Sequence, residues 1–192
     1  MAENTQIPTD GKLLWSGEHW IAYLRPDGTQ RPGAMVSLYH AYISPAGRGT
    51  AAFVQIDGEN GFTGLCTDSH GFARFVKETQ ITPAVPYDPE MSVVDAEFRK
   101  GGDVLERPCW TISTDSREVV TTWDDLQTPL VAPPTANPRI VFTILVFAGK
   151  ANIDLDGKSM DGDPYPRSIW AKSLGTPRSS CVFALAETMV RE

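Results

Sequence analysis

The chain has 192 residues, of which 41% are hydrophobic and 21% are charged, and its formal net charge is −7. This length suits one domain with a sizeable core, and the acidic balance without basic clusters argues against a nucleic-acid partner. No apolar run reaches the roughly 18 residues of a membrane span, and the polar start lacks the pattern of a signal peptide. We therefore expect a cytoplasmic protein with no membrane partner.

The first half of the chain has the pattern of short strands separated by turns. Residues 1–12 are polar and predict a flexible leader, which leaves 13–192 for the folded domain. Arg25-Pro26-Asp27-Gly28 and Asp57-Gly58 are strong turn sequences, because Gly, Pro and Asp favour the backbone angles of tight turns. The strands are expected over residues 13–24, 35–43, 50–56 and 61–66.

One short helix is expected over residues 69–78. Phe72, Phe75 and Val76 recur at helical spacing there, although Gly71 weakens the pattern. Further along, the proline-rich stretch 129–138 predicts a long loop, and loops of that length often border a site. The later strands are expected over residues 92–99, 104–113, 118–124, 140–148 and 181–186.

Two of these runs, 140–148 and 181–186, are apolar without alternation. A strand with one wet face alternates, so we expect both to be covered on both faces, the outer one by another layer or another subunit. Because such surface is rarely left exposed, a homodimer is expected.

Short connections between consecutive strands make them antiparallel neighbours. Roughly eight to ten strands with about one short helix predict a mainly β fold, a meandering antiparallel barrel or sandwich. We take a single antiparallel β-barrel as the expected architecture.

The strand over 92–99 has an apolar face and a charged face, the latter carrying Asp95, Glu97 and Arg99. These three side chains could form a solvated outer surface. Alternatively, they could line a barrel interior as paired charges, where a carboxyl beside an arginine would be a tuned acid or base. The sequence leaves both interpretations open.

His40 lies between Tyr39 and Tyr42 on an expected strand, and imidazole with phenol can transfer protons on an enolisable substrate. A half-buried histidine bonded to a neighbour is the simpler alternative. His70 follows Asp68-Ser69 at a probable helix start, where those residues serve as caps, or where His70 lies at a pocket mouth.

Trp110 and Trp123 lie on expected strands, as core residues or as walls of an apolar pocket. Arg167 follows a proline in an ordered turn, where it holds loop carbonyls or clamps an anionic substrate.

Motifs for metals and cofactors are missing. The chain has no HxH or HExxH spacing and no GxGxxG, GxxxxGK[ST] or GxSxG sequence. Asp154-Leu155-Asp156-Gly157 fails the calcium pattern, since Lys158 stands where an oxygen ligand is required, and predicts a hairpin instead. Cys66, Cys109 and Cys181 are widely separated and predict buried free thiols. We expect neither a metal nor a cofactor.

The closing third has an apolar strand, an Asp-Gly hairpin, Tyr165-Pro166-Arg167, and Pro177-Arg178-Ser179-Ser180 before the last strand. This arrangement resembles lipocalin-type barrels, above all the carotenoid-hydratase-like branch of lipocalin-related enzymes, which are longer and have two barrels. Gly17-Glu18-His19-Trp20 misses the Gly-x-Trp spacing of lipocalins by one residue. The resemblance implies a lipocalin-like barrel with a cavity for a small molecule, and it transfers no catalytic residue.

The resulting hypothesis is a cofactor-independent enzyme that acts on a hydrophobic or aromatic small molecule by acid/base proton transfer, as an isomerase, hydratase, lyase or cyclase. Its expected catalytic residues are His40, Tyr42, Asp95 and Glu97. A carrier with the same pocket is the alternative, and a subunit whose apolar strands serve only assembly is a third. The expected substrate-binding residues are Tyr39, His70, Arg99, Trp110, Trp123 and Arg167.

Overall fold

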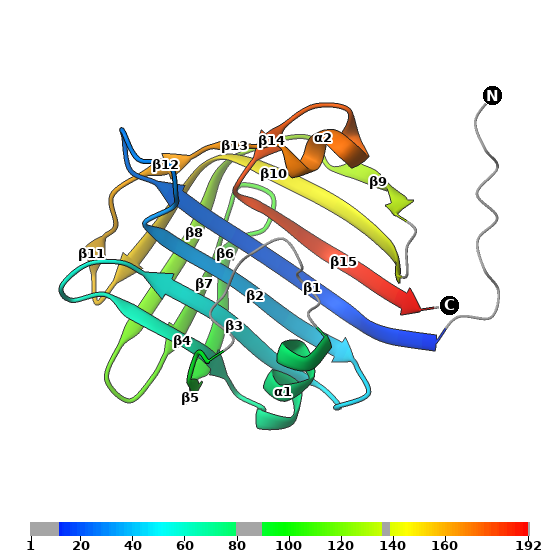
Figure 1. The fold of residues 1–192 in the computed structure, drawn as a ribbon, viewed down its shortest axis with the longest axis horizontal. Coiled ribbons are helices and arrows are strands. Elements are labelled where there is room, and N and C mark those ends of the chain that lie inside the picture. The colour runs from blue at the N-terminus through cyan, green and yellow to red at the C-terminus, as the bar shows by residue number, and fades with distance from the viewer. Residues whose placement is uncertain (1–11, 80–89, 136–138, 192) are drawn as a thin grey trace.

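The computed structural model describes residues 12–79, 90–135 and 139–191 (Figure 1). The first half forms β1 (Lys12–Arg25), β2 (Ala34–Ile43), β3 (Gly49–Ile56), β4 (Phe62–Thr67), α1 (His70–Thr79), β5 (Val93–Asp95) and β6 (Glu97–Asp103). The second half forms β7 (Arg107–Ser113), β8 (Glu118–Leu126), β9 (Leu130–Thr135), β10 (Arg139–Leu155), β11 (Lys158–Ser159), β12 (Asp163–Pro164), β13 (Pro166–Arg167), α2 (Ile169–Leu174), β14 (Arg178–Ser179) and β15 (Val182–Arg191).

Most strands belong to one strongly curled, mixed sheet, so the prediction of a mainly β fold is confirmed. The strand order is β5-β4-β3-β2-β1-β15-β10-β8-β7-β6, with β9 and β11 paired to β10 and β12 to β1. The predicted closed antiparallel barrel is corrected to an open half-barrel, because the β4–β5 pair is parallel and the edge strands β5 and β6 do not pair. Only Ala96 separates β5 from β6 along the chain, and one residue is too short a connection for the two strands to turn back and pair.

Turn chemistry accounts for several connections, as predicted. Gly58 joins β3 to β4 with a φ of 116°, a conformation that glycine adopts without strain. The β10–β11 hairpin turns at Asp156 and Gly157, whose φ values of 53° and 77° are those of a type I′ turn. Helix α1 is shifted by one residue from its predicted span of 69–78.

Three segments differ from the expectation. Part of the proline-rich stretch 129–138 forms β9, whose prolines are tolerated because the strand pairs only with β10; residues 136–138 lie outside the described chain. The expected strand 92–99 breaks at Ala96 into β5 and β6, and the following turn comes at 104–106. Helix α2 was not predicted, because its 6 residues are too few to show helical periodicity of apolar residues in the sequence.

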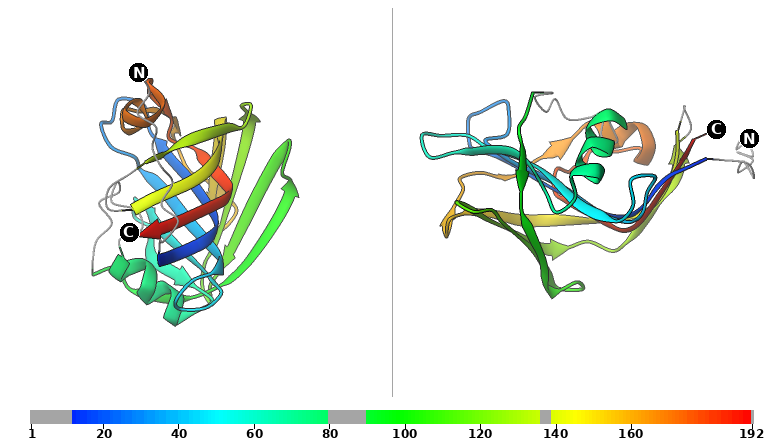
Figure 2. Two further views of the ribbon diagram at one scale, coloured as in Figure 1. Left: turned by 90° about the vertical axis from the view of Figure 1, so that its right-hand side faces the viewer. Right: turned by 90° about the horizontal axis from the view of Figure 1, so that it is seen from below.

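The inner face of the curled sheet holds the main core. Trp20 lies with its ring stacked on Phe183 at 4.3 Å and tilted against Trp123 at 5.1 Å. Trp110 approaches the same ring edge-on at 6.2 Å, and all four aromatic side chains are at most 4% exposed. These rings join β1 and β15 to β7 and β8, which curl beneath them (Figure 2).

The opposite face of the sheet is covered by both helices, which lie on the same side (Figure 2). Phe72 and Val76 of α1 pack with Trp15 and Tyr39. Trp170 of α2 packs against a cluster from β1, β10 and β15, meeting Phe147 edge-on at 5.3 Å. Neither described helix is long and apolar enough to cross a membrane.

Strand β10 is buried on both faces over residues 145–148, as its apolar run predicts, whereas Ile144 in the same run is 45% exposed. Val146 and Ala148 belong to the inner core, whereas Leu145 and Phe147 face α2. The outer layer at this point comes from the same chain.

Two glycines provide a matched test of the packing at the β1–β2 pair. A Cβ at Gly17 would overlap the carbonyl oxygen of His40 and lie 2.9 Å from the Cα of Ala41, whereas a Cβ at Gly71 would meet only the Ala46 oxygen at 3.8 Å. We expect Gly17→Ala to lower the free energy of unfolding by about 2–4 kcal/mol, because neither backbone atom can move aside alone. Gly71→Ala should raise it by up to about 1 kcal/mol, since alanine favours a helix.

Urea unfolding followed by circular dichroism measures both variants. Equal effects of the two substitutions would contradict the close approach of β1 to β2.

Candidate functional site

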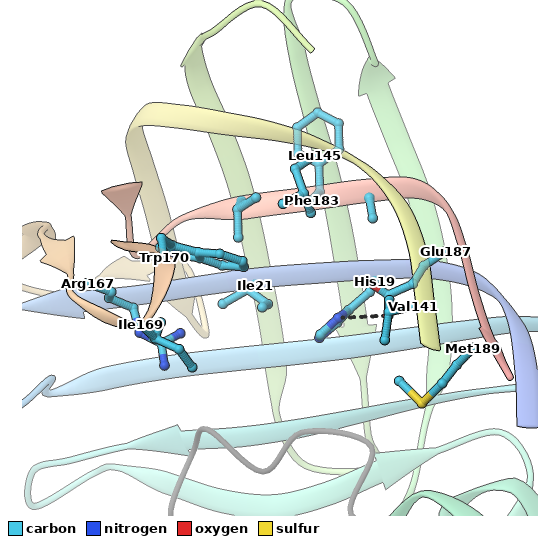
Figure 3. A pocket seen from close by; sticks show the side chains of 12 residues that line it. His19, Ile21, Val141, Leu145, Arg167, Ile169, Trp170, Phe183, Glu187 and Met189 are labelled. Atoms are coloured by element: carbon cyan, nitrogen blue, oxygen red, sulfur yellow. Dashed lines mark ion pairs between the residues drawn. The ribbon is translucent and has the colours of Figure 1, made fainter. Parts of the chain in front are cut away.

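An apolar cavity of about 150 Å³ lies on the face of the sheet that carries α2 (Figure 3). Its lining comes from β1, β10, β13, α2 and β15. Apart from the titratable or charged residues His19, Arg167 and Glu187, the lining side chains are aliphatic, aromatic or methionine. Ligand sites commonly combine an apolar wall with a few converging polar groups, so this cavity is the candidate site.

His19 is the central polar group of this pocket. Its Nε2 is hydrogen-bonded to the Oγ of Ser37 at 3.1 Å, and its Nδ1 lies 3.6 Å from the Oε1 of Glu187. The imidazole also stacks on the ring of Tyr39, with centroids 4.2 Å apart and planes 20° from parallel. Its orientation is therefore fixed from three sides, while 11% of its side chain is still exposed.

Glu187 reaches the pocket because of a bulge in β15. Gly17 pairs with Glu187, and His19 pairs with Ala184. Between these two pairs β15 therefore advances by three residues, whereas β1 advances by two. The same shift occurs against β10, where Thr143 pairs with Glu187 and Leu145 with Ala184. Regular alternation from Ala184 would turn position 187 to the inner face, so the extra residue returns Glu187 to the pocket.

Ser37, His19 and Glu187 follow the order of a nucleophile–base–acid triad. The serine, however, is 0% exposed and lies beneath the imidazole. A nucleophile has to reach its substrate, so the buried hydroxyl serves here to hold Nε2. The geometry therefore argues against attack by Ser37 on a bound molecule.

Tyr39 was predicted to contact substrate, and the structure places it beside His19 on the α1 side of the pocket. Burial raises the pKa of the Tyr39 hydroxyl well above its ordinary value, and the nearby Tyr23 and Glu187 add to this rise. The phenol is therefore neutral at physiological pH, and its ring supports the imidazole.

Arg167 was predicted as an anion clamp, and it lines the same cavity from β13. Its guanidinium lies over the ring of Tyr23, 5.0 Å from the centroid. In Figure 3, Arg167 and Trp170 lie toward one end of the labelled side chains, whereas His19 and Glu187 lie toward the other.

The predicted residues His40, Tyr42 and Trp110 gather at a different place, on the inner face near the end of β2. The ring of His40 lies 5.3 Å from Tyr42 and 5.6 Å from Trp110, and its Nδ1 is hydrogen-bonded to Thr50 Oγ1 at 2.9 Å. The structure thus brings these three together, although their catalytic and binding roles stay predictions.

Glu18, which was not among the predicted site residues, is the buried carboxylate of this second cluster. Its carboxylate accepts hydrogen bonds from Trp20 Nε1 at 2.8 Å, from Lys100 Nζ at 2.8 and 3.0 Å, and from the Tyr42 hydroxyl. Burial alone would raise the pKa of Glu18, but these donors and the Lys100 charge outweigh it and lower the pKa. Burial, together with the hydrogen bond to Glu18 and the Glu18 charge, raises the pKa of the Tyr42 hydroxyl to about 12.

The remaining predicted residues are spread over the surface and core. The Oδ1 atom of Asp95 lies 2.7 Å from the Nε2 atom of His70, and both side chains are largely exposed. Arg99 lies 4.0 Å from Glu118 on the outside of β6, and Glu97 is exposed on the same strand. Trp123 is 0% exposed and donates its Nε1–H to the carbonyl of Ile21 at 2.9 Å.

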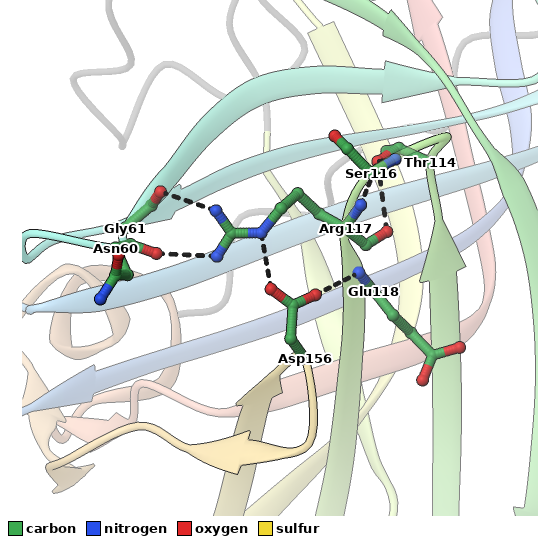
Figure 4. A network of polar contacts seen from close by, with 7 residues as sticks. All are labelled: Asn60, Gly61, Thr114, Ser116, Arg117, Glu118 and Asp156. Carbon is green, nitrogen blue, oxygen red and sulfur yellow. Dashed lines mark hydrogen bonds and ion pairs between the residues drawn. The ribbon is translucent and has the colours of Figure 1, made fainter.

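A second cavity, of about 430 Å³, lies where three loops meet at one end of the sheet. Arg117 lines this cavity, and Figure 4 shows its polar contacts: Nε contacts Asp156 Oδ2 at 2.7 Å, and the two terminal nitrogens donate to the carbonyls of Asn60 and Gly61 at 2.7 and 3.4 Å. The other oxygen of Asp156 accepts the backbone N–H of Glu118 at 2.8 Å. These contacts tie the loops together, so we assign this network to stability.

The three cysteines are free, and Cys66 and Cys181 are buried. Within the described parts of the chain, no three His, Cys, Asp or Glu side chains come close enough together to hold a metal ion.

No model of a known protein family matches the sequence, and no curated protein matches it either. The function therefore has to be argued from the geometry of the site. In particular, no family match links the chain to the lipocalins.

The Glu18 cluster should make stability depend on pH. Because the pKa of Glu18 is lower in the folded protein than its ordinary 4.5, its contribution is complete above that value and is lost as the pH falls through the folded pKa. We expect Glu18→Gln to lower the free energy of unfolding by about 2 kcal/mol at pH 7, and this difference to shrink below pH ~4.

Chemical unfolding between pH 3 and pH 7 gives these values, with the exposed Glu106→Gln as the control that should change little. A difference between wild type and Glu18→Gln that is the same at every pH would contradict the depressed pKa.

Proposed function

We propose that the protein is a cofactor-independent enzyme that transfers a proton on a small hydrophobic or aromatic molecule bound in the α2-side pocket. The observation that supports this proposal is the His19–Glu187 pair, set at 3.6 Å in a cavity whose other lining side chains, apart from Arg167, are apolar. A histidine base with an adjacent carboxylate is an arrangement that general acid/base catalysis uses.

The Nδ1 atom of His19 is the proposed site of proton transfer. Its 3.6 Å separation from Glu187 exceeds a normal hydrogen bond, so the carboxylate does not saturate this nitrogen. A ligand proton can approach Nδ1 from the cavity, while Ser37 keeps Nε2 engaged. When His19 takes up that proton, the carboxylate of Glu187 stabilises the imidazolium through an interaction that the low-polarity surroundings strengthen.

The size of the cavity limits the ligand. A cavity of comparable volume, about 150 Å³ with an apolar lining, accommodates one benzene ring. We therefore propose a substrate with one aromatic ring or a short branched chain, whose reactive carbon lies next to His19. Isomerisation, hydration, elimination and cyclisation all begin with a proton transfer of this kind.

A carrier that binds the same molecule unchanged is the second candidate. It is favoured by the complete burial of Ser37 and the near-complete burial of Glu187, at 0% and 7% exposed, which restrict solvent access to the polar groups. The two functions differ in whether His19 exchanges protons with the ligand.

Proton exchange in D₂O separates these functions without knowledge of the natural substrate. We expect wild-type protein to accelerate exchange at the α-carbon of phenylacetone, followed by ¹H NMR, because His19 would remove the proton and return a deuteron. His19→Gln and Glu187→Gln should each reduce the rate by roughly 100-fold or more, with unchanged circular dichroism. Glu106→Gln is the matched acidic control and should exchange at the wild-type rate.

His40→Gln tests the competing assignment from the sequence. Loss of exchange in His40→Gln with full activity in His19→Gln would move the site to the inner cluster. Binding of phenylacetone without any exchange in the wild type would favour the carrier.

A further inference from the structure

Two arginines oppose each other in the β13–β14 ladder, and one of them, Arg167, lines the α2 end of the pocket. In the short β13–β14 ladder, Arg167 pairs directly with Arg178, so both side chains leave the same face of the ribbon. Like charges at directly opposed positions destabilise an antiparallel pair. An anion between or beside the two guanidinium groups would convert this repulsion into attraction.

Two N–H groups at this end also lack acceptors. The Nε of Arg178 and the Nε1 of Trp170 are buried and have no hydrogen-bond partner among the described residues. A buried donor without a partner costs about 1–3 kcal/mol. Trp170 and Arg167 both line the cavity. One ligand could therefore place an apolar part in the cavity and a polar group with several acceptor atoms in this corner.

We propose that the Arg167–Trp170–Arg178 corner binds a carboxylate of the ligand, an inference that rests on the proposed function of the pocket. A carboxylate matches the planar fork of a guanidinium and has acceptor sites left for the indole N–H. Its small size is compatible with a cavity of about 150 Å³ that already has to hold a ring or a short chain.

The opposite charges at the two ends determine how such a ligand lies. Arg167 and Trp170 are near one end of the side chains drawn in Figure 3, and Glu187 and His19 are near the other. The Glu187 carboxylate repels an anion, so the ligand's carboxylate is directed to the arginines and its other end to His19. The substrate class is therefore a small aryl- or alkyl-carboxylic acid with its reactive carbon away from the carboxylate.

Isothermal titration with a matched pair of probes tests this assignment. Phenylacetate and 3-phenylpropanoate carry the charge, and phenylacetamide and 3-phenylpropanamide are their neutral counterparts of nearly equal size. We expect each carboxylate to bind at least 10-fold more tightly than its amide at pH 7.5. Arg167→Gln or Arg178→Gln should remove most of that preference while amide affinity stays within about 3-fold, and Trp170→Phe should reduce it less.

Arg48→Gln, an exposed arginine outside the pocket, is the control and should retain the full preference. Equal affinity for carboxylate and amide in the wild type would overturn the carboxylate site while leaving the proposed pocket intact. If Arg167→Gln and Arg178→Gln weaken the binding of carboxylate and amide equally, the arginines serve only to hold the fold, and the carboxylate site is also overturned. Failure of all four probes to bind would overturn this inference and the proposed pocket together.

Discussion

The bulge in β15 is the constraint on which the candidate site depends. Two residues, Leu185 and Ala186, occupy the space opposite one residue on each neighbouring strand, and this reverses the faces of all later side chains in β15. Without it, regular alternation would turn Glu187 to the inner face of the sheet, away from His19. With it, the carboxylate meets His19 on the pocket face, so a local irregularity of one strand creates the His19–Glu187 pair.

Strand β1 divides the molecule into two chemically different sides. Trp20 packs into the inner core with Phe183 and Trp123, while its neighbour His19 faces the α2-side pocket. The half-barrel is filled with aromatic side chains on its inner face, and the cavity lies on the outer face between the sheet and its covering elements. Glu18 belongs to the inner side, where Lys100 links β1 to the edge strand β6. The same stretch of backbone thus supports stability on one face and the proposed chemistry on the other.

The residues that were predictable are those governed by local rules. Period-two alternation and turn chemistry located most strands, the Asp57-Gly58 and Asp156-Gly157 hairpins, and helix α1. Arg167 was selected from its position in an ordered turn and lines the pocket. Tyr39 was selected from its neighbours on a strand and stacks on the pocket residue His19. Glu187 was missed because its face depends on a bulge formed by Leu185 and Ala186, neither of which carries the glycine signal of a bulge. His19 and Glu18 bind partners that are more than 15 residues away in the sequence, so no local pattern identifies these contacts. The sheet stays open because β5 and β6 do not pair, and local patterns do not distinguish paired from unpaired edge strands. The homodimer and the cytoplasmic location stay predictions.

Native mass spectrometry after incubation with a cell extract tests the central claim most directly, with wild type and His19→Gln compared in parallel. The account predicts that both proteins retain a small carboxylic acid, which denaturation releases for identification. His19→Gln should hold it unchanged, whereas the wild type should hold or release an isomer or a species that differs by the gain or loss of water. The same unchanged compound on both proteins, with no conversion in the surrounding extract, would contradict an enzymatic role for His19 and leave a carrier.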